Sequence, residues 1–271
     1  MVRSVTLHRL GIGAVWRLAA KSLVSRHSDR GDLSDASVGA RDSSKSRLPT
    51  GGELNEAEAS VPGSSQVYGA VEVVQQPTGL TNWCDVVATV RSCERCGLAR
   101  QRTQAVVGVG DENADWLFVG EGPGAEEDLR GEPFVGQAGK LLDAMLAGLG
   151  IARGHGVYIA NAVKCRPPNN RTPEPDEIEA CFPYLQRQIE LIRPRVIVAL
   201  GRPAAQALLK QEIRIGAARG QVFRFGEIPV VVTYHPAYLL RNPADKGKAW
   251  ADLCFARKTL ASSPPKVKET V

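Results

Sequence analysis

The sequence predicts an α/β fold, in which the strands of a sheet alternate with helices along the chain. Short apolar runs of strand length recur, and several of them end at a glycine or at a polar residue. The segments between these runs repeat their apolar residues at helical spacing. Candidate functional residues directly follow the runs, and α/β sheets bind ligands at the carboxyl ends of such strands. We therefore expect a ligand site at one edge of the sheet.

Four apolar runs are predicted to be the main strands. The first is bounded by Gly120 and the third by Gly201, and a hairpin partner at 221–225 precedes the fourth. The four runs are residues 116–119, 157–160, 196–200 and 230–233.

The segments around these strands are predicted to be helices. Thr172 and Pro173 suit the N-cap and first position of one helix, because proline has no N–H and fits the first helical turn. The predicted helices span residues 82–98, 137–149, 173–191, 203–209 and 247–260.

The chain has 271 residues, a net charge of +5 and 43% hydrophobic residues, which is ample for a folded core. The basic balance suits an anionic partner, although many basic proteins bind no nucleic acid. No apolar run approaches the roughly 20 residues that a membrane helix needs. We therefore expect a soluble protein with no membrane partner.

The first 26 residues contain five Arg or Lys and no acidic residue. They could be an organelle-type presequence, a basic arm or the product of a start codon assigned too far upstream, and we favour the last or a non-essential extension. Residues 28–78 are rich in small and polar residues and are predicted to be a disordered linker. The predicted organisation is an extension and linker over 1–78, a folded domain over 79–262 and a disordered tail over 263–271.

Six cysteines in a chain of intracellular character favour a metal site over disulfides. Cys93 and Cys96 form a C-x-x-C motif, whose two intervening residues let the chain turn around an ion. Cys165 and Cys181 follow downstream, with 15 residues between them. This spacing alone does not distinguish zinc from an iron–sulfur cluster.

The loop from Glu121 to Phe134 follows the first main strand and is predicted to line a pocket. Gly122 and Gly124 allow a tight turn and a close approach of backbone N–H groups to a ligand. A strand-to-helix turn without a ligand is the alternative, since the loop has neither a complete G-x-G-x-x-G motif nor a phosphate-binding P-loop. The lone aromatic residue of the loop, Phe134, favours a binding function.

Asn161 and His235 each stand at the carboxyl end of a predicted strand. The Asn side chain has both a donor and an acceptor, so it can read the edge of a uracil base, and a turn-capping role fits its position equally well. A neutral imidazole aimed at a carbonyl oxygen would make His235 an electrophile, although a lone His is more often structural.

The segment after His235 is predicted to be a loop that contacts DNA. Its apolar side chains could push into a base stack, and its cation could hold a phosphate. The predicted contacts are Tyr238, Leu239, Leu240 and Arg241.

Three separated segments carry these motifs: GEGPGAEEDLRGEPFVGQAG (120–139), NAVKCRPPNNRTP (161–173) and YHPAYLLRNP (234–243). With the four cysteines they resemble the family 4 uracil-DNA glycosylases, the iron–sulfur branch of the uracil-DNA glycosylase superfamily. The resemblance covers roughly residues 80–260. It implies a three-layer α/β/α domain with a central four-stranded parallel sheet, and a [4Fe–4S] cluster on Cys93, Cys96, Cys165 and Cys181.

The resemblance also implies how a base is bound. Uracil flipped out of DNA would stack on Phe134, be read at its polar edge by Asn161 and receive a hydrogen bond at O2 from His235. Hydrolysis of the N-glycosidic bond would release free uracil and leave an abasic site, the first step of base excision repair.

The resemblance does not by itself identify the residue that activates the attacking water. Many relatives in the superfamily carry an Asp in the first motif where this chain has Gly122. We therefore expect Glu121 or Glu127 to position or activate the water, with Asn170 as a possible hydrogen-bond partner.

Two other functions are compatible with parts of the pattern. One is a non-catalytic iron–sulfur protein that binds damaged DNA on the same scaffold, and the other is hydrolysis of a free nucleoside. The joint presence of Phe134, Asn161 and His235 favours catalysis, and the apolar and cationic segment after His235 favours a polymer substrate. We predict a monomeric cytoplasmic enzyme whose partner is uracil-containing single- or double-stranded DNA.

Overall fold

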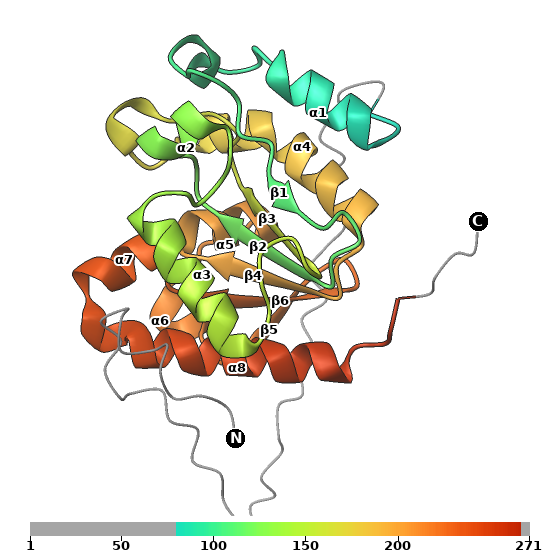
Figure 1. The fold of residues 1–271 in the computed structure, drawn as a ribbon, viewed down its shortest axis with the longest axis vertical. Helices are drawn as coiled ribbons and strands as arrows, with labels where there is room; N and C mark the ends of the chain where they lie inside the picture. The colour runs from blue at the N-terminus through green and yellow to red at the C-terminus, as the bar shows by residue number, and fades with distance from the viewer. Residues whose placement is uncertain (1–79, 267–271) are drawn as a thin grey trace, which may run out of the picture. The chain divides into compact units, whose positions relative to one another are not determined.

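The computed structural model describes residues 80–266. The predicted extension and linker over 1–78 lie outside the described residues, as do residues 267–271 of the predicted tail. The rest forms a sheet with helices on both of its faces (Figure 1).

The sheet has six strands in the order β1-β3-β2-β4-β6-β5. The four central strands are parallel, as predicted, whereas β1 and β5 pair antiparallel at the two edges. Every residue of β2, β3 and β4 is buried, which explains why these strands read as unbroken apolar runs. The strands are β1 (Val109–Gly110), β2 (Trp116–Gly120), β3 (Val157–Asn161), β4 (Val196–Leu200), β5 (Val222–Phe225) and β6 (Ile228–Thr233).

The helices form the two outer layers. Side chains of α4 and α5 pack on one face of the sheet, and side chains of α3, α7 and α8 pack on the other. None of the helices within residues 80–266 is long and apolar enough to cross a membrane. The helices are α1 (Trp83–Arg91), α2 (Ala125–Arg130), α3 (Gln137–Leu149), α4 (Pro175–Ile192), α5 (Arg202–Leu209), α6 (Ile215–Ala218), α7 (Pro236–Arg241) and α8 (Lys246–Ser262).

Two predicted helices begin or end elsewhere. The helix predicted over 82–98 ends at Arg91, so the C-x-x-C motif lies in non-helical chain before a short 3₁₀ helix, Gly97–Arg100. The predicted cap at Thr172 is wrong: Glu174 is the N-cap of α4 and Pro175 is its first residue. Glu174 has this role because its backbone N–H donates to the Glu177 carboxylate, 2.8 Å away, in a capping arrangement.

The segment after His235 is the helix α7 and not the predicted loop. Pro236 occupies its first turn, where a missing N–H costs nothing, and His235 caps it. Successive side chains therefore point in different directions around the helix axis, which decides which of them can reach a partner.

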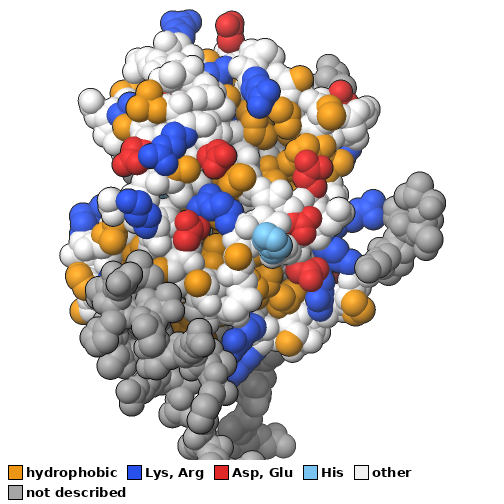
Figure 2. Space-filling view, in the orientation of Figure 1, with side chains coloured by type: hydrophobic (Ala, Val, Ile, Leu, Met, Phe, Trp, Pro, Cys, Tyr) orange, Lys and Arg blue, Asp and Glu red, His pale blue; other side chains and the backbone are white. Residues whose placement is uncertain are grey.

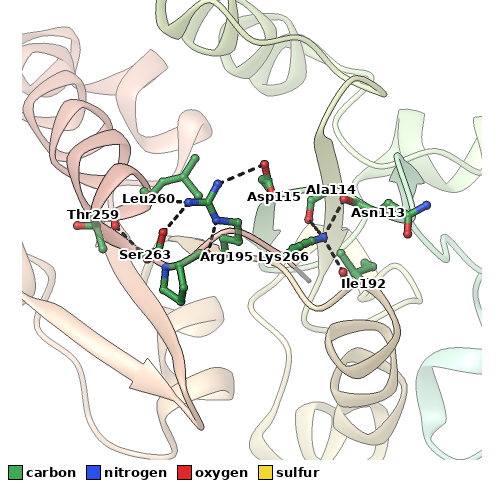
Figure 3. A network of polar contacts seen from close by, with 10 residues as sticks. Asn113, Ala114, Asp115, Ile192, Arg195, Thr259, Leu260, Ser263 and Lys266 are labelled. Atoms are coloured by element: carbon green, nitrogen blue, oxygen red, sulfur yellow. Dashed lines mark hydrogen bonds and ion pairs between the residues drawn. The ribbon is translucent and has the colours of Figure 1, made fainter. Parts of the chain in front are cut away.

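The chain beyond α8 remains attached to the domain, although a disordered tail was predicted from residue 263. Arg195 donates hydrogen bonds to the backbone oxygens of Leu260, Ser263 and Pro264. The ammonium of Lys266 lies 2.7–2.8 Å from the backbone oxygens of Asn113, Ala114 and Ile192 (Figure 3). This C-terminal strap, residues 263–266, thus joins the end of α4 to the turn before β2.

Candidate functional site

The site lies at the carboxyl ends of the parallel strands. Gly120 ends β2 and is paired in register with Asn161, which ends β3. A Cβ atom at Gly120 would collide with the side-chain oxygen of Asn161 and lie 2.6 Å from the Phe134 ring. The strand end, the amide and the aromatic ring are therefore in direct contact, and only glycine fits between them.

Phe134 is held by its backbone in an unusual conformation. Its φ angle is 56°, a region that non-glycine residues rarely adopt. Arg153 donates to the carbonyl oxygens of Pro133 and Phe134, each at 2.8 Å. The Phe134 ring lies 5.5 Å from the His235 ring, measured between centroids, with 32° between the planes. The predicted stacking residue and the predicted electrophile are thus neighbours.

Asn161 carries an unsatisfied polar atom. The residue is 2% exposed, and its Oδ1 has no hydrogen-bond partner among the described residues. Leaving a buried acceptor unpaired costs about 1–3 kcal/mol, so such groups are rare outside functional sites. The turn-capping alternative is not supported, because no backbone N–H donates to this oxygen.

His235 is placed as a neutral donor. The backbone N–H of Ala237 donates to Nδ1 at 3.2 Å, so in the neutral ring the proton is carried by Nε2. Burial, assisted by the nearby charge of Arg241, lowers the pKa of His235 to about 4, although Glu127 opposes the shift. The ring is therefore uncharged at neutral pH and offers one N–H.

The two candidate carboxylates have different surroundings. Glu127 accepts hydrogen bonds from the backbone N–H groups of Val135 and Gly136 with one oxygen and from that of Gly124 with the other. It fixes the loop on both sides of Phe134. Glu121 has no such set of backbone donors, and burial raises its pKa, against the effects of Thr172 and Arg202.

The surroundings of the other two predicted site residues, Gly122 and Asn170, are also defined by the structure. A Cβ atom at Gly122 would lie 2.8 Å from a methyl group of Val163, so a larger residue there would require the Val163 side chain to move. Asn170 is exposed, and its side-chain oxygen accepts a 2.7 Å hydrogen bond from Arg166. The structure thus gives Asn170 a partner other than Glu121 or Glu127.

The four predicted cysteine ligands come together from three parts of the chain. Cys93, Cys96, Cys165 and Cys181 line one small cavity of about 10 Å³. Two N–H groups donate to their sulfurs: Arg102 Nη1 is 2.9 Å from Cys165 Sγ, and the Lys164 backbone nitrogen is 3.2 Å from Cys181 Sγ. No group of three or more His, Cys, Asp or Glu in residues 80–266 is placed to hold a single metal ion. Four cysteine thiols are a donor set that suits zinc as well as an iron–sulfur cluster.

The four predicted DNA contacts on α7 differ in how exposed their side chains are. Leu239 is 1% exposed and belongs to the core, so its predicted contact with DNA is wrong, because its direction on the helix points inward. Leu240 is 43% exposed, and Arg241 is also exposed. Tyr238 stacks on Tyr234, with 5.0 Å between centroids, and its hydroxyl donates to Asp245.

Basic side chains do not form a continuous patch on the face of the domain that Figure 2 shows. On the face shown in Figure 2, acidic and basic side chains are interspersed with apolar ones. This face therefore has no continuous basic surface of the kind that would follow a phosphate backbone.

Sequence reasoning missed several residues that shape the site. Arg153 could not be found, because its partners are 19 and 20 residues away in an irregular loop. Lys164 could have been singled out from the sequence, because it is a cation that stands between Asn161, at the end of a predicted strand, and the predicted ligand Cys165.

The family model described as the uracil DNA glycosylase superfamily matches residues 107–254, more than half of the chain. The chain belongs to the uracil DNA glycosylase superfamily. The match includes the first motif, both Asn161 and His235, and the two downstream cysteines.

Curated relatives confirm the resemblance to the type 4 branch of this superfamily. A type-4 uracil-DNA glycosylase of Archaeoglobus fulgidus is 50% identical over 167 residues, which are 59% of this chain and 83% of the relative. One of Pyrobaculum aerophilum is 44% identical over 174 residues, 61% of this chain and 88% of the relative. One of Saccharolobus solfataricus is 45% identical over 190 residues, 66% of this chain and 88% of the relative.

Proposed function

We propose that this protein is a DNA repair glycosylase that releases uracil from DNA and leaves an abasic site. The observation that carries the proposal is the buried, unpaired Oδ1 of Asn161 beside Phe134. Uracil presents an N3–H donor between two carbonyl oxygens, and this donor would satisfy the orphaned oxygen. Cytosine presents an acceptor at N3 and would leave Oδ1 unpaired, which gives a physical basis for discrimination.

His235 acts where charge develops in the reaction. When the bond between C1′ and N1 breaks, the departing uracil keeps the electron pair and becomes anionic, partly at O2. The Nε2–H of a neutral His235 would donate a hydrogen bond to O2 that strengthens as this charge grows. The low pKa of His235 supports a hydrogen-bond role and not full proton transfer.

Glu121 is our candidate for positioning the water. In this step the water oxygen bonds to C1′ of the sugar, and one of its protons passes to the carboxylate. Its position directly after β2, beside Gly120, and the lack of a backbone donor set support Glu121 over Glu127. Phe134 would supply the stacking surface for the flipped base.

Cys93, Cys96, Cys165 and Cys181 would hold a [4Fe–4S] cluster, as the type 4 resemblance implies. When bound, the cluster would cross-link the segment before β1, the turn after β3 and helix α4. Its role is structural, and the chemistry above depends on the chain's own side chains. We also propose that the protein is a monomer and that it acts on DNA in the cytoplasm.

The test is single-turnover release of uracil from a labelled oligonucleotide, with anaerobically purified wild type, Asn161→Ala and the control Asn113→Ala. Asn113 lies before β2, at the opposite end of the strand. We expect Asn161→Ala to lose about 100- to 1,000-fold in rate, the scale on which transition-state hydrogen bonds act, and Asn113→Ala to match the wild type. Folded wild type that binds uracil-containing DNA without releasing base would establish the non-catalytic binding protein instead.

A further inference from the structure

Lys164 is a buried lysine whose ammonium has no Asp or Glu partner in the described part of the chain. It is 1% exposed and lies in the turn between Asn161 and Cys165. Its ammonium donates to the backbone oxygen of Asn161 at 2.9 Å and to Oε1 of Gln188 at 2.6 Å. Both acceptors are uncharged, and no carboxylate in residues 80–266 forms an ion pair with it. A buried ammonium is costly unless a negative charge lies nearby.

The four-cysteine site would supply that charge when it is loaded. Lys164 directly precedes Cys165 in the chain and lines the same cavity as Cys165 and Cys181. The backbone N–H of Lys164 also donates to Cys181 Sγ at 3.2 Å. Cysteines that bind a metal group do so as thiolates, so the loaded site would place negative charge beside Lys164.

The opposite end of this link is Asn161, the residue that we propose reads the base. The hydrogen bond from Lys164 to the Asn161 carbonyl closes the turn that follows β3. The same turn is bound to the first motif, because Ala162 donates to the Gly120 oxygen and Val163 donates to the Glu121 oxygen. The main chain that carries the unpaired Asn161 amide is therefore held by Lys164 on one side and by the first motif on the other.

We propose that Lys164 is a positioning residue that couples the four-cysteine site to base recognition. Its backbone N–H holds it to Cys181, and its ammonium fixes the Asn161 main chain so that Oδ1 faces the base. Gln188 completes the link, because its amide donates to the Val107 oxygen at 2.9 Å and so orients the oxygen that binds Lys164. This inference rests on the proposed function.

The experiment compares wild type, Lys164→Met and Lys210→Met, all purified anaerobically. Methionine keeps most of the lysine volume and removes the charge and the donor. Lys210 is an exposed lysine at the C-cap of α5 whose ammonium lies 3.6 Å from the centre of the Phe182 ring, so it controls for the loss of a lysine charge outside the turn after β3. Three quantities are measured: iron per folded protein, single-turnover uracil release per iron-loaded protein, and hydrogen exchange of the Ala162 and Val163 amides.

In Lys164→Met we expect the single-turnover rate of uracil release per iron-loaded protein to fall about 10- to 100-fold. This is the range expected for the loss of a charged hydrogen bond. Affinity for DNA that carries a non-hydrolysable 2′-fluoro-deoxyuridine should change by less than about threefold, because phosphate contacts dominate it. The Ala162 and Val163 amides should exchange faster than in the wild type, and Lys210→Met should match the wild type in every measurement.

Several results would overturn the inference. Release per iron-loaded protein within about threefold of the wild type would show that Lys164 does not position Asn161. Unchanged exchange at Ala162 and Val163 would do the same, and a parallel loss of DNA affinity would indicate general disorder. If Lys164→Met does not fold, Gln188→Leu is measured in its place, with a smaller loss of release expected and wild-type behaviour contradicting the link. Inactivity of the wild type is a separate outcome that rejects the proposed function.

Discussion

Oε1 of Glu127 lies 2.9 Å from the backbone nitrogen of Val135, the residue that follows Phe134. The same oxygen accepts from Gly136 at 3.0 Å, and Oε2 accepts from Gly124 at 3.1 Å. A carboxylate with both oxygens occupied by backbone N–H groups is a loop anchor, since its lone pairs already have donors. The hypothesis that Glu127 activates water therefore competes with a positioning role.

The two roles separate in a pair of substitutions. We expect Glu127→Gln to keep most of the uracil release, within about tenfold of the wild type, because its oxygen still accepts from Val135 and Gly136. Glu127→Ala should lose at least about 100-fold, because the Phe134 loop loses its anchor. Single-turnover kinetics measure both, with Glu126→Gln on the exposed side of α2 as the control. Equal losses in Gln and Ala would restore the water-activating role.

The pH dependence of release tests the assignment of Glu121. Burial raises the pKa of Glu121 above its ordinary value of 4.5, so the carboxylate is lost as pH falls through that raised value. His235, with a pKa of about 4, remains neutral over this range and gains a proton only at lower pH. We expect an acid limb set by Glu121, and a plateau above it.

Glu121→Gln provides the check on this prediction. The variant should have a lower plateau, and its remaining acid limb should move down toward pH 4, where His235 becomes charged. An acid limb that stays at the wild-type pH in single-turnover profiles would show that another group titrates.

Neighbouring leucines on α7 should respond in opposite ways. Leu239→Ala removes a core side chain and should lower the free energy of unfolding by about 2–5 kcal/mol. Leu240→Ala, at an exposed position, should change it by less than about 0.5 kcal/mol. If Leu240 helps to open a duplex, its loss should slow release from double-stranded DNA more than from single-stranded DNA. Equal effects on the two substrates would rule out that role.

The C-terminal strap makes a prediction about stability alone. Lys266→Met removes three hydrogen bonds from a cation to backbone oxygens and should lower the free energy of unfolding by about 1–3 kcal/mol. Release of uracil should not change, because the strap lies at the starts of the strands. Denaturant unfolding measures the first quantity, and Lys258→Met, at an exposed position on α8, is the control. A stability equal to that of the control would mean that the strap contributes nothing.

The sequence predicted the parts of the molecule that follow from local pattern. The buried parallel strands were found because burial on both faces leaves an unbroken apolar run. Asn161 and His235 were found because they directly follow such runs. The edge strand β1 was missed because two residues carry no periodicity, and α7 was read as a loop because one and a half turns beside a proline resemble a turn.

Other features depend on contacts between distant residues. The left-handed backbone of Phe134 has no signal in its own residue type, since Arg153 and Glu127 impose it from outside. The burial of Leu239 likewise could not be predicted, because the direction of its side chain depends on this segment being a helix. The four cysteines were found by resemblance, but the hydrogen bonds from Arg102 and Lys164 to their sulfurs were not.

The anchoring of Lys266 determines where the polypeptide leaves the domain. Asn113 and Ala114 precede β2, and Ile192 precedes β4, so the last described residue is fixed at the edge of the sheet opposite to Asn161 and His235. The side of the domain that carries Asn161 and His235 is therefore clear of the chain between α8 and Lys266.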